Sequence, residues 1–425
     1  MSVADSMILN APAPDAARES DGARRPWRVL MIVESAAGGT GRHVLDLCEG
    51  FIARGCDAHV IYSTGRVDRM FLNRLAKIPA LHQQAIRMRT APHPSDVGVV
   101  RAVKRYMREH GPFDVIHGHS SKGGAIARLA AFGTGIPAFY TLHGLIMMDP
   151  GLPRWKWLMY YSAEMAMTWR TQRIIAVSPE EQRAARKLGF GHDRVTMVPN
   201  GVGPLGGATR KIARQTMGVA EDQIVIGFIG RLVEQKAPHI LIEAFANTLK
   251  VTPNARLAIV GAGPLEREMH DLATRLGAAD KIIWLGERDA RGVIAGFDLF
   301  ALSSRKEGLP YVVLEAMVTG LPVVATNKAG VEILIDPGVS GEVVPADDAK
   351  AFGDALIRLT SDPARLAAQS KAAGERAKRF TVDAMVEGTI QAYEGALSPS
   401  PGTPGAGRGE GDFERRAPLE NSNHP

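Results

Sequence analysis

Apolar runs alternate along this chain with stretches in which apolar residues recur every three or four positions. Short runs rich in Val, Ile and Leu are typical of buried strands, and the spacing of three and four is typical of amphipathic helices. In the first half we expect strands at residues 28–35, 57–64, 114–119, 138–144, 173–178 and 194–201, with helices at 41–55, 99–111 and 123–135. This order predicts a parallel sheet with helices on both faces.

The same alternation begins again near residue 223. Strands are expected at residues 223–232, 256–263, 281–286, 298–304 and 322–327, with helices at 238–250, 265–277 and 312–320. We therefore predict an α/β protein of two Rossmann-like, doubly wound domains that face one another across a cleft.

Domain boundaries follow from this pattern. We place the N-terminal domain at 27–203 and the C-terminal domain at 204–381, and we expect the amphipathic helix at 382–396 to pack back on the N-terminal domain. The termini, 1–26 and 397–425, are rich in Ala, Pro, Gly, Ser and charged residues, which predicts disordered tails.

Composition indicates the class of protein and its cellular compartment. The 425 residues are 45% apolar and 23% charged, as in ordinary globular proteins. No apolar run approaches the ~18 residues that span a bilayer, and the N-terminus lacks the basic-then-apolar order of a signal peptide. Cys48 and Cys56 are the only cysteines, so there is no disulfide framework and no zinc-binding spacing. We predict a cytoplasmic protein.

Charge is distributed unevenly between the domains. Residues 27–203 hold 23 Lys and Arg against 13 Asp and Glu, a net of +10, whereas residues 204–396 hold 22 against 24, a net of −2. The positive half is either a solvated basic surface or a surface that attracts anionic lipid or a phosphorylated acceptor. No nucleic-acid recognition motif accompanies it, so we expect no nucleic-acid partner.

Two glutamates, Glu307 and Glu315, carry the clearest chemical signal. Glu307 follows an expected strand, Glu315 lies on the first turns of the next helix, and Gly308 and Leu309 lead into that helix. Parallel sheets bind ligands at the carboxyl ends of their strands, and the amides at a helix N-terminus attract anions. Carboxylates beside such a helix start suit a ligand with hydroxyls at one end and phosphates at the other, such as a sugar nucleotide.

Candidate phosphate ligands lie at two other strand ends. Arg231 and Lys236 follow the first strand of the C-terminal domain, and Gly38 and Gly39 follow the first strand of the N-terminal domain. Arg and Lys pair with phosphate oxygens, and glycines let the backbone approach a phosphate closely. Alternatively, the cations are surface residues and the glycines form only a tight turn. The glycine spacing is not GxGxxG and no acidic residue ends the second strand, which argues against a dinucleotide-binding oxidoreductase.

Three histidines, His117, His119 and His143, also lie at C-terminal strand ends. A histidine there can bond a sugar hydroxyl or a phosphate, or transfer a proton. Each could instead be a hydrogen-bonded structural residue, and no fourth ligand completes a metal site. The chain has no Asp-x-Asp pair to hold a divalent metal, so we predict neither a metal nor a cofactor. Protein cations and helix-end amides would then stabilise a departing diphosphate.

Taken together, the motifs of this chain resemble those of one family. In order, they are AAGGTGRHV, HGHSSKGGAIARLAA, TLHG, IIAVS, VPNGV, GRLVEQK, VGAGP and EGLPYVVLEAMVTGLPVVAT, all within residues 28–396. They look like the motifs of the retaining glycosyltransferases of family 4, which have the two-domain GT-B fold.

This resemblance implies roles for the candidate residues. Glu315 would bind the ribose of the nucleotide, and Glu307 would bind hydroxyls of the donor sugar. Arg231 and Lys236 would neutralise the leaving diphosphate, and the Gly39 backbone would meet its distal phosphate.

The resemblance also implies a mechanism. A sugar would be transferred with retention from an α-linked nucleotide donor, with His119 or His143 near donor and acceptor. The departing diphosphate would take the proton of the acceptor, so no separate protein base is required. Ala237 stands where these proteins often have Gly, which affects the turn more than the chemistry. We expect a lipid-linked or cell-envelope glycan as acceptor; the alternative is a decayed, non-catalytic module that binds nucleotide sugar or carbohydrate.

Residues 151–173 form an aromatic, basic stretch with three of the five Trp and two of the seven Tyr. Rings beside cations suit a lipid headgroup layer or a groove for a polyprenyl-phosphate sugar. Alternatively, the rings pack on the first sheet. Together with the basic N-terminal domain, the stretch favours peripheral contact with an anionic membrane at the inner face of the plasma membrane.

Overall fold

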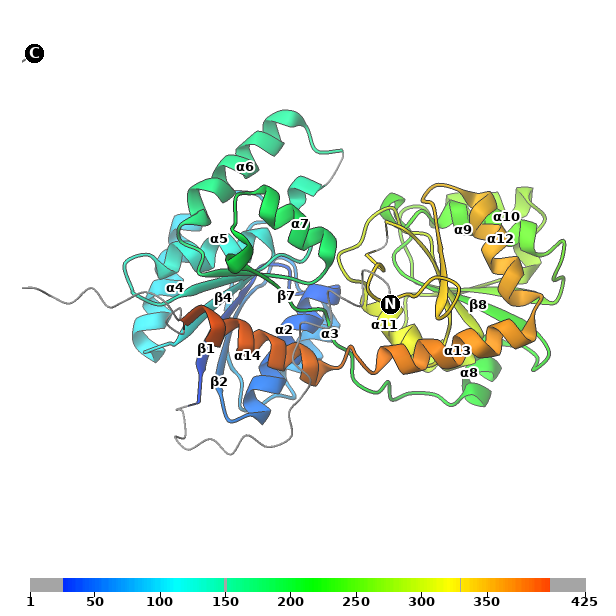
Figure 1. The fold of residues 1–425 in the computed structure, drawn as a ribbon, viewed down its shortest axis with the longest axis horizontal. Coiled ribbons are helices and arrows are strands. Elements are labelled where there is room, and N and C mark those ends of the chain that lie inside the picture. Colours follow the sequence, from blue (N-terminus) through cyan, green and yellow to red (C-terminus); the bar gives the residue numbers. More distant parts are fainter. Residues whose placement is uncertain (1–25, 149–150, 329, 398–425) are drawn as a thin grey trace, which may run out of the picture.

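The computed structural model describes residues 26–148, 151–328 and 330–397, which form two lobes with one parallel sheet each (Figure 1). The first sheet has seven strands in the order β3-β2-β1-β4-β5-β6-β7, and the second has six in the order β10-β9-β8-β11-β12-β13. The predicted α/β, two-domain fold is confirmed. The tails predicted at the termini lie outside the described residues, apart from Pro26 and Leu397.

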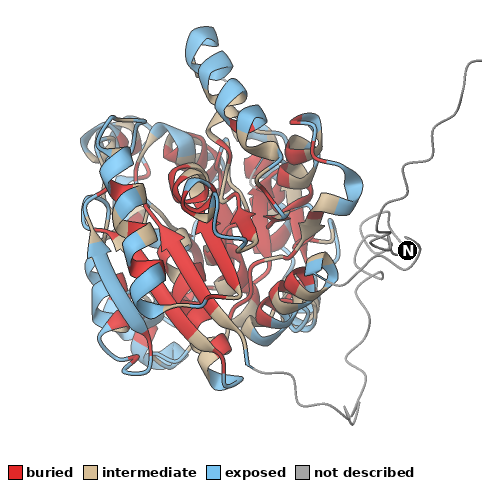
Figure 2. Ribbon diagram, turned by 90° about the vertical axis from the view of Figure 1, so that its left-hand side faces the viewer, coloured by how far each residue is buried: buried red, intermediate tan, exposed pale blue. Residues whose placement is uncertain are grey.

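The first lobe is a doubly wound unit in which helices cover both faces of the sheet. Its elements are β1 (Arg28–Val33), α2 (Gly38–Ala53), β2 (Asp57–Ser63), α3 (Arg69–Leu75), β3 (His82–Ile86), α4 (Asp96–His110), β4 (Val115–His119), α5 (Ser120–Ala131), β5 (Ala138–Thr141), α6 (Arg154–Thr168), β6 (Arg173–Ala176), α7 (Pro179–Lys187) and β7 (Val195–Met197). Strands β1 and β4 at the centre of the sheet are buried almost throughout, and burial on both faces explains the apolar run of β1. Strand β4 is equally buried but carries His117 and His119. Figure 2 shows the buried strands enclosed by helices with exposed outer faces.

The second lobe repeats this plan. Its elements are α8 (Arg210–Met217), β8 (Ile224–Ile229), α9 (Pro238–Thr248), β9 (Ala255–Val260), α10 (Glu266–Arg275), β10 (Ile282–Gly286), β11 (Leu299–Leu302), α11 (Tyr311–Val318), β12 (Val323–Thr326), β13 (Gly341–Val344), α12 (Ala349–Thr360) and α13 (Pro363–Ala377). The loop between β11 and α11 lies at the carboxyl edge of this sheet, where it faces the first lobe.

The last helix, α14 (Val382–Leu397), returns from the second lobe and packs on the first (Figure 1). Its Val386 and Tyr393 are fully buried in the apolar cluster that contains Phe51 and Val29. The Tyr393 hydroxyl also lies 2.6 Å from Nδ1 of His117. The chain therefore crosses twice between the lobes, and α14 completes the core of the first.

The structure corrects two details that bear on the site. Helix α2 begins at Gly38 rather than at residue 41, so Gly38 and Gly39 belong to its first turn. Strand β5 ends at Thr141, which leaves His143 on the loop beyond it with a left-handed φ of 51°.

None of the helices in the described parts of the chain is both long and apolar enough to cross a bilayer.

Candidate active site

A cavity of about 250 Å³ lies between the two lobes. The first lobe contributes the start of α2 and the segments that follow β5, β6 and β7. The second contributes the loop between β8 and α9, the loop between β11 and α11, and the start of α11. The lining residues are Gly39, Thr40, His143, Val177, Asn200, Lys236, Glu307, Gly308, Leu309, Pro310, Tyr311 and Val312. Six of the ten residues predicted for catalysis or donor binding are among them. The other four are Gly38, His119, Arg231 and Glu315.

Glu307 and Lys236 come together in the cavity. Lys236 Nζ donates to Oε1 of Glu307 over 2.6 Å, and Ser304 Oγ donates to the same oxygen over 2.7 Å. Lys236 is held by its backbone as well, because its carbonyl accepts a hydrogen bond from Ser303 Oγ. The two side chains are 17% and 13% exposed, so a ligand can still reach both charges.

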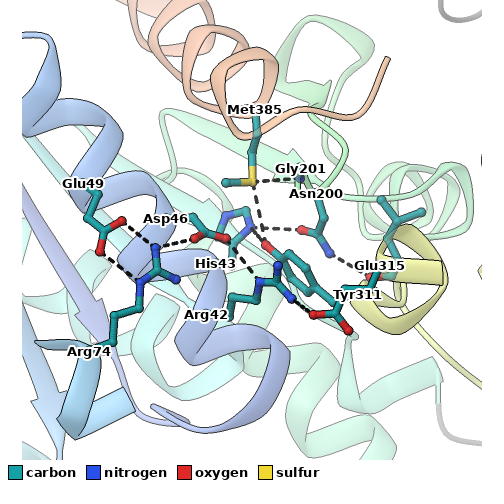
Figure 3. A network of polar contacts seen from close by, with 11 residues as sticks. Arg42, His43, Asp46, Glu49, Arg74, Asn200, Gly201, Tyr311, Glu315 and Met385 are labelled. Atoms are coloured by element: carbon teal, nitrogen blue, oxygen red, sulfur yellow. Dashed lines mark hydrogen bonds and ion pairs between the residues drawn. The ribbon is translucent and has the colours of Figure 1, made fainter. Parts of the chain in front are cut away.

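Arg231 is exposed and does not line the cavity. Glu315, on α11, points at the first lobe instead, where it forms an ion pair with Arg42 of α2 (Figure 3). The Arg42 guanidinium also lies 4.7 Å from the centre of the Tyr311 ring. Glu315 is therefore in the interlobe gap with a cation already paired to it.

The glycine turn of α2 approaches the second lobe closely. Gly38 donates its N–H to Oδ2 of Asp68 over 2.7 Å, whereas Gly39 lines the cavity. A Cβ at Gly39 would lie 3.3 Å from Cδ2 of Tyr311, so a side chain there would press on the opposite lobe. Across the gap, Asn200 donates to the Leu309 carbonyl over 2.8 Å.

The predicted histidines have different surroundings. His143 lines the cavity, and His119 lies behind it, with Nδ1 of His119 3.1 Å from Nε2 of His143. His117 is buried between Tyr393 and Thr141, which fits the structural alternative. Burial lowers the pKa of all three well below the usual value, and neighbouring histidines lower it further. The three imidazoles are thus neutral at pH 7.

Two further residues, Glu181 and His43, lie beside the loop that carries His143, and neither is among the residues predicted from the sequence. Glu181, at the N-terminus of α7, accepts hydrogen bonds from the backbone N–H of Gly144 over 2.5 Å and of Val177 over 3.0 Å. Burial raises the pKa of Glu181 to about 7, although these two bonds oppose the shift. His43 bonds through Nδ1 to Oδ1 of Asn200 over 3.0 Å, and burial lowers its pKa to about 4.

His43 and Asn200 stand in the motifs GTGRHV and VPNGV, so their positions were available from the sequence. Their partnership was not, because 157 residues separate them along the chain. Figure 3 shows them joined to Tyr311 of the second lobe, whose hydroxyl lies 3.4 Å from Nδ1 of His43.

Ring nitrogens of His43, His119 and His143 lie within 4.8 Å of one another. Neutral imidazoles are common metal ligands, and Nε2 of His43 is buried without a hydrogen-bond partner. This group could hold a cation, so the expectation of a metal-free site stays a prediction. A second such group, Asp57, His59 and His82, lies on β2 and β3, away from the cavity.

Known proteins match both lobes of the chain. The model for Glycosyltransferase Family 4 matches residues 37–204, and the model for Glycosyl transferases group 1 matches residues 209–379. A D-inositol 3-phosphate glycosyltransferase from Saccharomonospora viridis is 30% identical over 328 residues, which cover 72% of this chain and 75% of that protein.

Two other proteins extend the comparison. One relative is the Escherichia coli UDP-Gal:alpha-D-GlcNAc-diphosphoundecaprenol alpha-1,3-galactosyltransferase. It is 29% identical over 264 residues, which cover 59% of this chain and 67% of that protein. The solved structure of Anabaena Alr3699/HepE in complex with UDP and glucose matches with a TM-score of 0.74 at 23% identity, covering 86% of this chain and 98% of that one. With both lobes matched and the cavity between them, the chain belongs to the family 4, group 1 glycosyltransferases of GT-B fold.

Proposed function

We propose that this protein is a retaining glycosyltransferase that transfers a sugar from a nucleotide diphosphate sugar to a lipid-linked or cell-envelope glycan. The interlobe cavity carries this proposal, because an acid and a cation of the second lobe meet there with His143 and the first turn of α2. A cavity with an acid, a cation and an imidazole among apolar lining residues suits a ligand with both hydroxyls and phosphates. UDP-sugars are the first donors to test, since the name of the E. coli relative specifies UDP-Gal and a diphosphoundecaprenol acceptor.

In the proposed reaction, the bond between the anomeric carbon and the diphosphate oxygen breaks, and the diphosphate leaves with the bonding electrons. Lys236, with the amides of Gly308 and Leu309, balances its growing charge. Arg231, which does not line the cavity here, would join them by turning toward the diphosphate. The acceptor hydroxyl attacks the anomeric carbon from the same face, so configuration is retained. Its proton passes to an oxygen of the departing diphosphate.

The remaining residues position the donor. Glu307 orients hydroxyls of the sugar. His143 lines the same cavity and contacts His119, which lies behind it. Glu315 binds the ribose, which requires its ion pair with Arg42 to open. The Gly39 N–H is proposed to reach the distal phosphate. No metal takes part, and we place the reaction in the cytoplasm.

A panel of radiolabelled nucleotide sugars with a membrane extract tests the reaction, because a lipid-linked product extracts into organic solvent. Glu307→Gln should lower transfer by about a hundredfold and keep the rise in Tm that nucleotide causes. Glu315→Gln should reduce that rise itself. Glu332→Gln is the control, since Glu332 belongs to an exposed interlobe ion pair with Arg183.

The outcomes separate the candidate functions. Full activity in both the Glu307 and the Glu315 variants would refute the site assignment. A rise in Tm with nucleotide but no transfer from any donor would favour the non-catalytic binding module. Transfer that EDTA abolishes and added metal restores would refute the metal-free mechanism.

A further inference from the structure

Helix α6 turns its apolar side chains outward. Only Glu164 is buried among its 15 residues, and that residue is charged. In contrast, Trp155 is 66% exposed and Leu158 is 59% exposed, and Trp169, just beyond the helix, is 67% exposed. Figure 1 shows α6 rising from the first lobe away from its sheet, and in Figure 2 its outer end is exposed. Large apolar side chains are presented to solvent here where a surface helix would normally present polar ones.

Most of the exposed apolar side chains lie on one side of the helix. Residues three, four and seven positions apart share one face of a helix, and Trp155, Leu158, Met159 and Met165 of α6 follow this spacing. Trp157, which is 39% exposed, lies on another side of the helix. Phe132, at the end of α5, extends the face, because its ring centre lies 6.4 Å from that of Trp169. We define the α6 surface as Phe132, Trp155, Leu158, Met159, Met165 and Trp169, all at least 40% exposed.

The opposite face of α6 fixes this orientation. Glu164 forms a buried ion pair with Arg128 of α5 over 2.7 Å, and the Arg128 side chain is fully buried. The Trp157 ring stacks on Tyr161 at 5.0 Å between centres, and Tyr161 packs against the first lobe. Rotating the helix to bury its apolar face would leave Arg128 as an unpaired buried charge, which is strongly unfavourable.

Cations accompany the α6 surface. The Arg170 guanidinium lies 3.6 Å from the ring centre of Phe132 and 3.5 Å from that of Trp169. Lys156 Nζ lies 5.4 Å from the ring centre of Trp155, and Arg154 is exposed beside it. Tryptophans interleaved with Lys and Arg on an exposed helix are typical of segments that lie in a membrane interface.

We propose that the α6 surface docks on an anionic lipid membrane, with its rings at the headgroup level and its cations against lipid phosphates. The charge of the first lobe favours an anionic partner, because residues 27–203 carry a net charge of +10. A second copy would bring a second lobe of the same charge to the surface, which is repulsive, whereas an anionic leaflet attracts it. The proposal concerns binding only and stands whether or not sugar transfer is demonstrated.

Flotation of the full chain with lipid vesicles tests the proposal. The protein should float with vesicles of phosphatidylcholine containing about a third phosphatidylglycerol, less at high salt, and poorly with phosphatidylcholine alone. Trp155→Ser with Leu158→Ser should lower partitioning at least about tenfold. Val251→Ser with Leu276→Ser is the matched control, since both residues are exposed apolar residues of the second lobe.

A second measurement needs no variant. Brominated lipid should quench tryptophan fluorescence of the wild-type protein, because three tryptophans lie in or beside α6. Flotation that the α6 substitutions leave unchanged, or a lack of quenching, would overturn the proposal. So would dimerisation that the same substitutions abolish while the protein shows no vesicle binding, because the occupant would then be a second copy.

Discussion

The charge state of the Glu181 carboxyl affects the backbone beside His143. The carboxylate accepts the Gly144 N–H, and Gly144 and His143 both have left-handed φ values, of 85° and 51°. A non-glycine residue in this region is strained and needs support from its surroundings. Glu181 supplies that support best as a carboxylate, and burial raises its pKa to about 7.

The activity of the enzyme should therefore fall as the pH drops through about 7, because protonation removes acceptor strength from Glu181. Glu181→Gln should lower kcat about tenfold by misplacing His143, and it should remove this step from the pH profile. Glu180→Gln serves as the control, because it changes the adjacent carboxylate and leaves the bond from Gly144 to Glu181 in place. A pH profile that Glu181→Gln leaves unchanged would show that another group titrates.

At the scale of elements, the first turn of α2 combines a packing glycine with a glycine at the cleft. A Cβ at Gly41 would lie 2.9 Å from the backbone carbon of Ala36, within one lobe, whereas a Cβ at Gly39 would meet Tyr311 of the other lobe. The same substitution at the two positions should thus have different effects.

Gly41→Ala should destabilise the protein by about 1–3 kcal/mol, because overpacking forces the backbone to move. Gly39→Ala should leave the free energy of unfolding nearly unchanged but slow transfer, since the added methyl group holds the lobes apart. Urea unfolding and steady-state kinetics on both variants separate these effects. Equal loss of stability in both would contradict the interlobe role of Gly39.

Elements with a strong apolar pattern were predictable, and those without it were not. The buried strands β1 and β8 follow directly from their apolar runs, RVLMIV and IVIGFI. Strand β3 escaped prediction because it is a polar edge strand, HQQAI, with four exposed residues. At the site, the Glu307–Lys236 pair could be expected from motifs on one lobe. The contacts of Asn200 and Arg42 could not, since they depend on how the two lobes meet.

At the scale of the molecule, the buried histidines of the first lobe make folding sensitive to acid. An unfolded histidine titrates near 6.5, while burial holds the pKa of His43 at about 4 and those of His117, His119 and His143 well below 6.5. Below pH 6.5 the unfolded chain binds protons that the folded chain does not. The stability that the neutral imidazoles contribute is complete above pH 6.5 and is lost as the pH falls toward 4.

The stability that the histidines lose at low pH exceeds the stability that Glu181 gains there. A histidine shifted from 6.5 to about 4 loses about 2 kcal/mol of stability at pH 5. Glu181, raised from 4.5 to about 7, stabilises the fold at low pH and loses that contribution as the pH rises toward 7, so it adds about 2 kcal/mol at pH 5 relative to pH 7. His59, whose pKa burial also lowers to about 4, joins the four histidines above, while Asp46 joins Glu181 as a carboxyl whose pKa burial raises. Five histidines against two carboxyl groups leave a net loss of stability at low pH.

Urea unfolding at pH 7.5, 6 and 5 should therefore show the free energy of unfolding falling by several kcal/mol. His43→Gln should reduce that fall by roughly 2 kcal/mol, because one depressed imidazole is removed. His192→Gln should not change it, since His192 is exposed. If wild-type protein were equally stable at pH 5 and pH 7.5, the histidine cluster would have to accept protons while folded, as it would if its rings were open to water in the gap between the lobes.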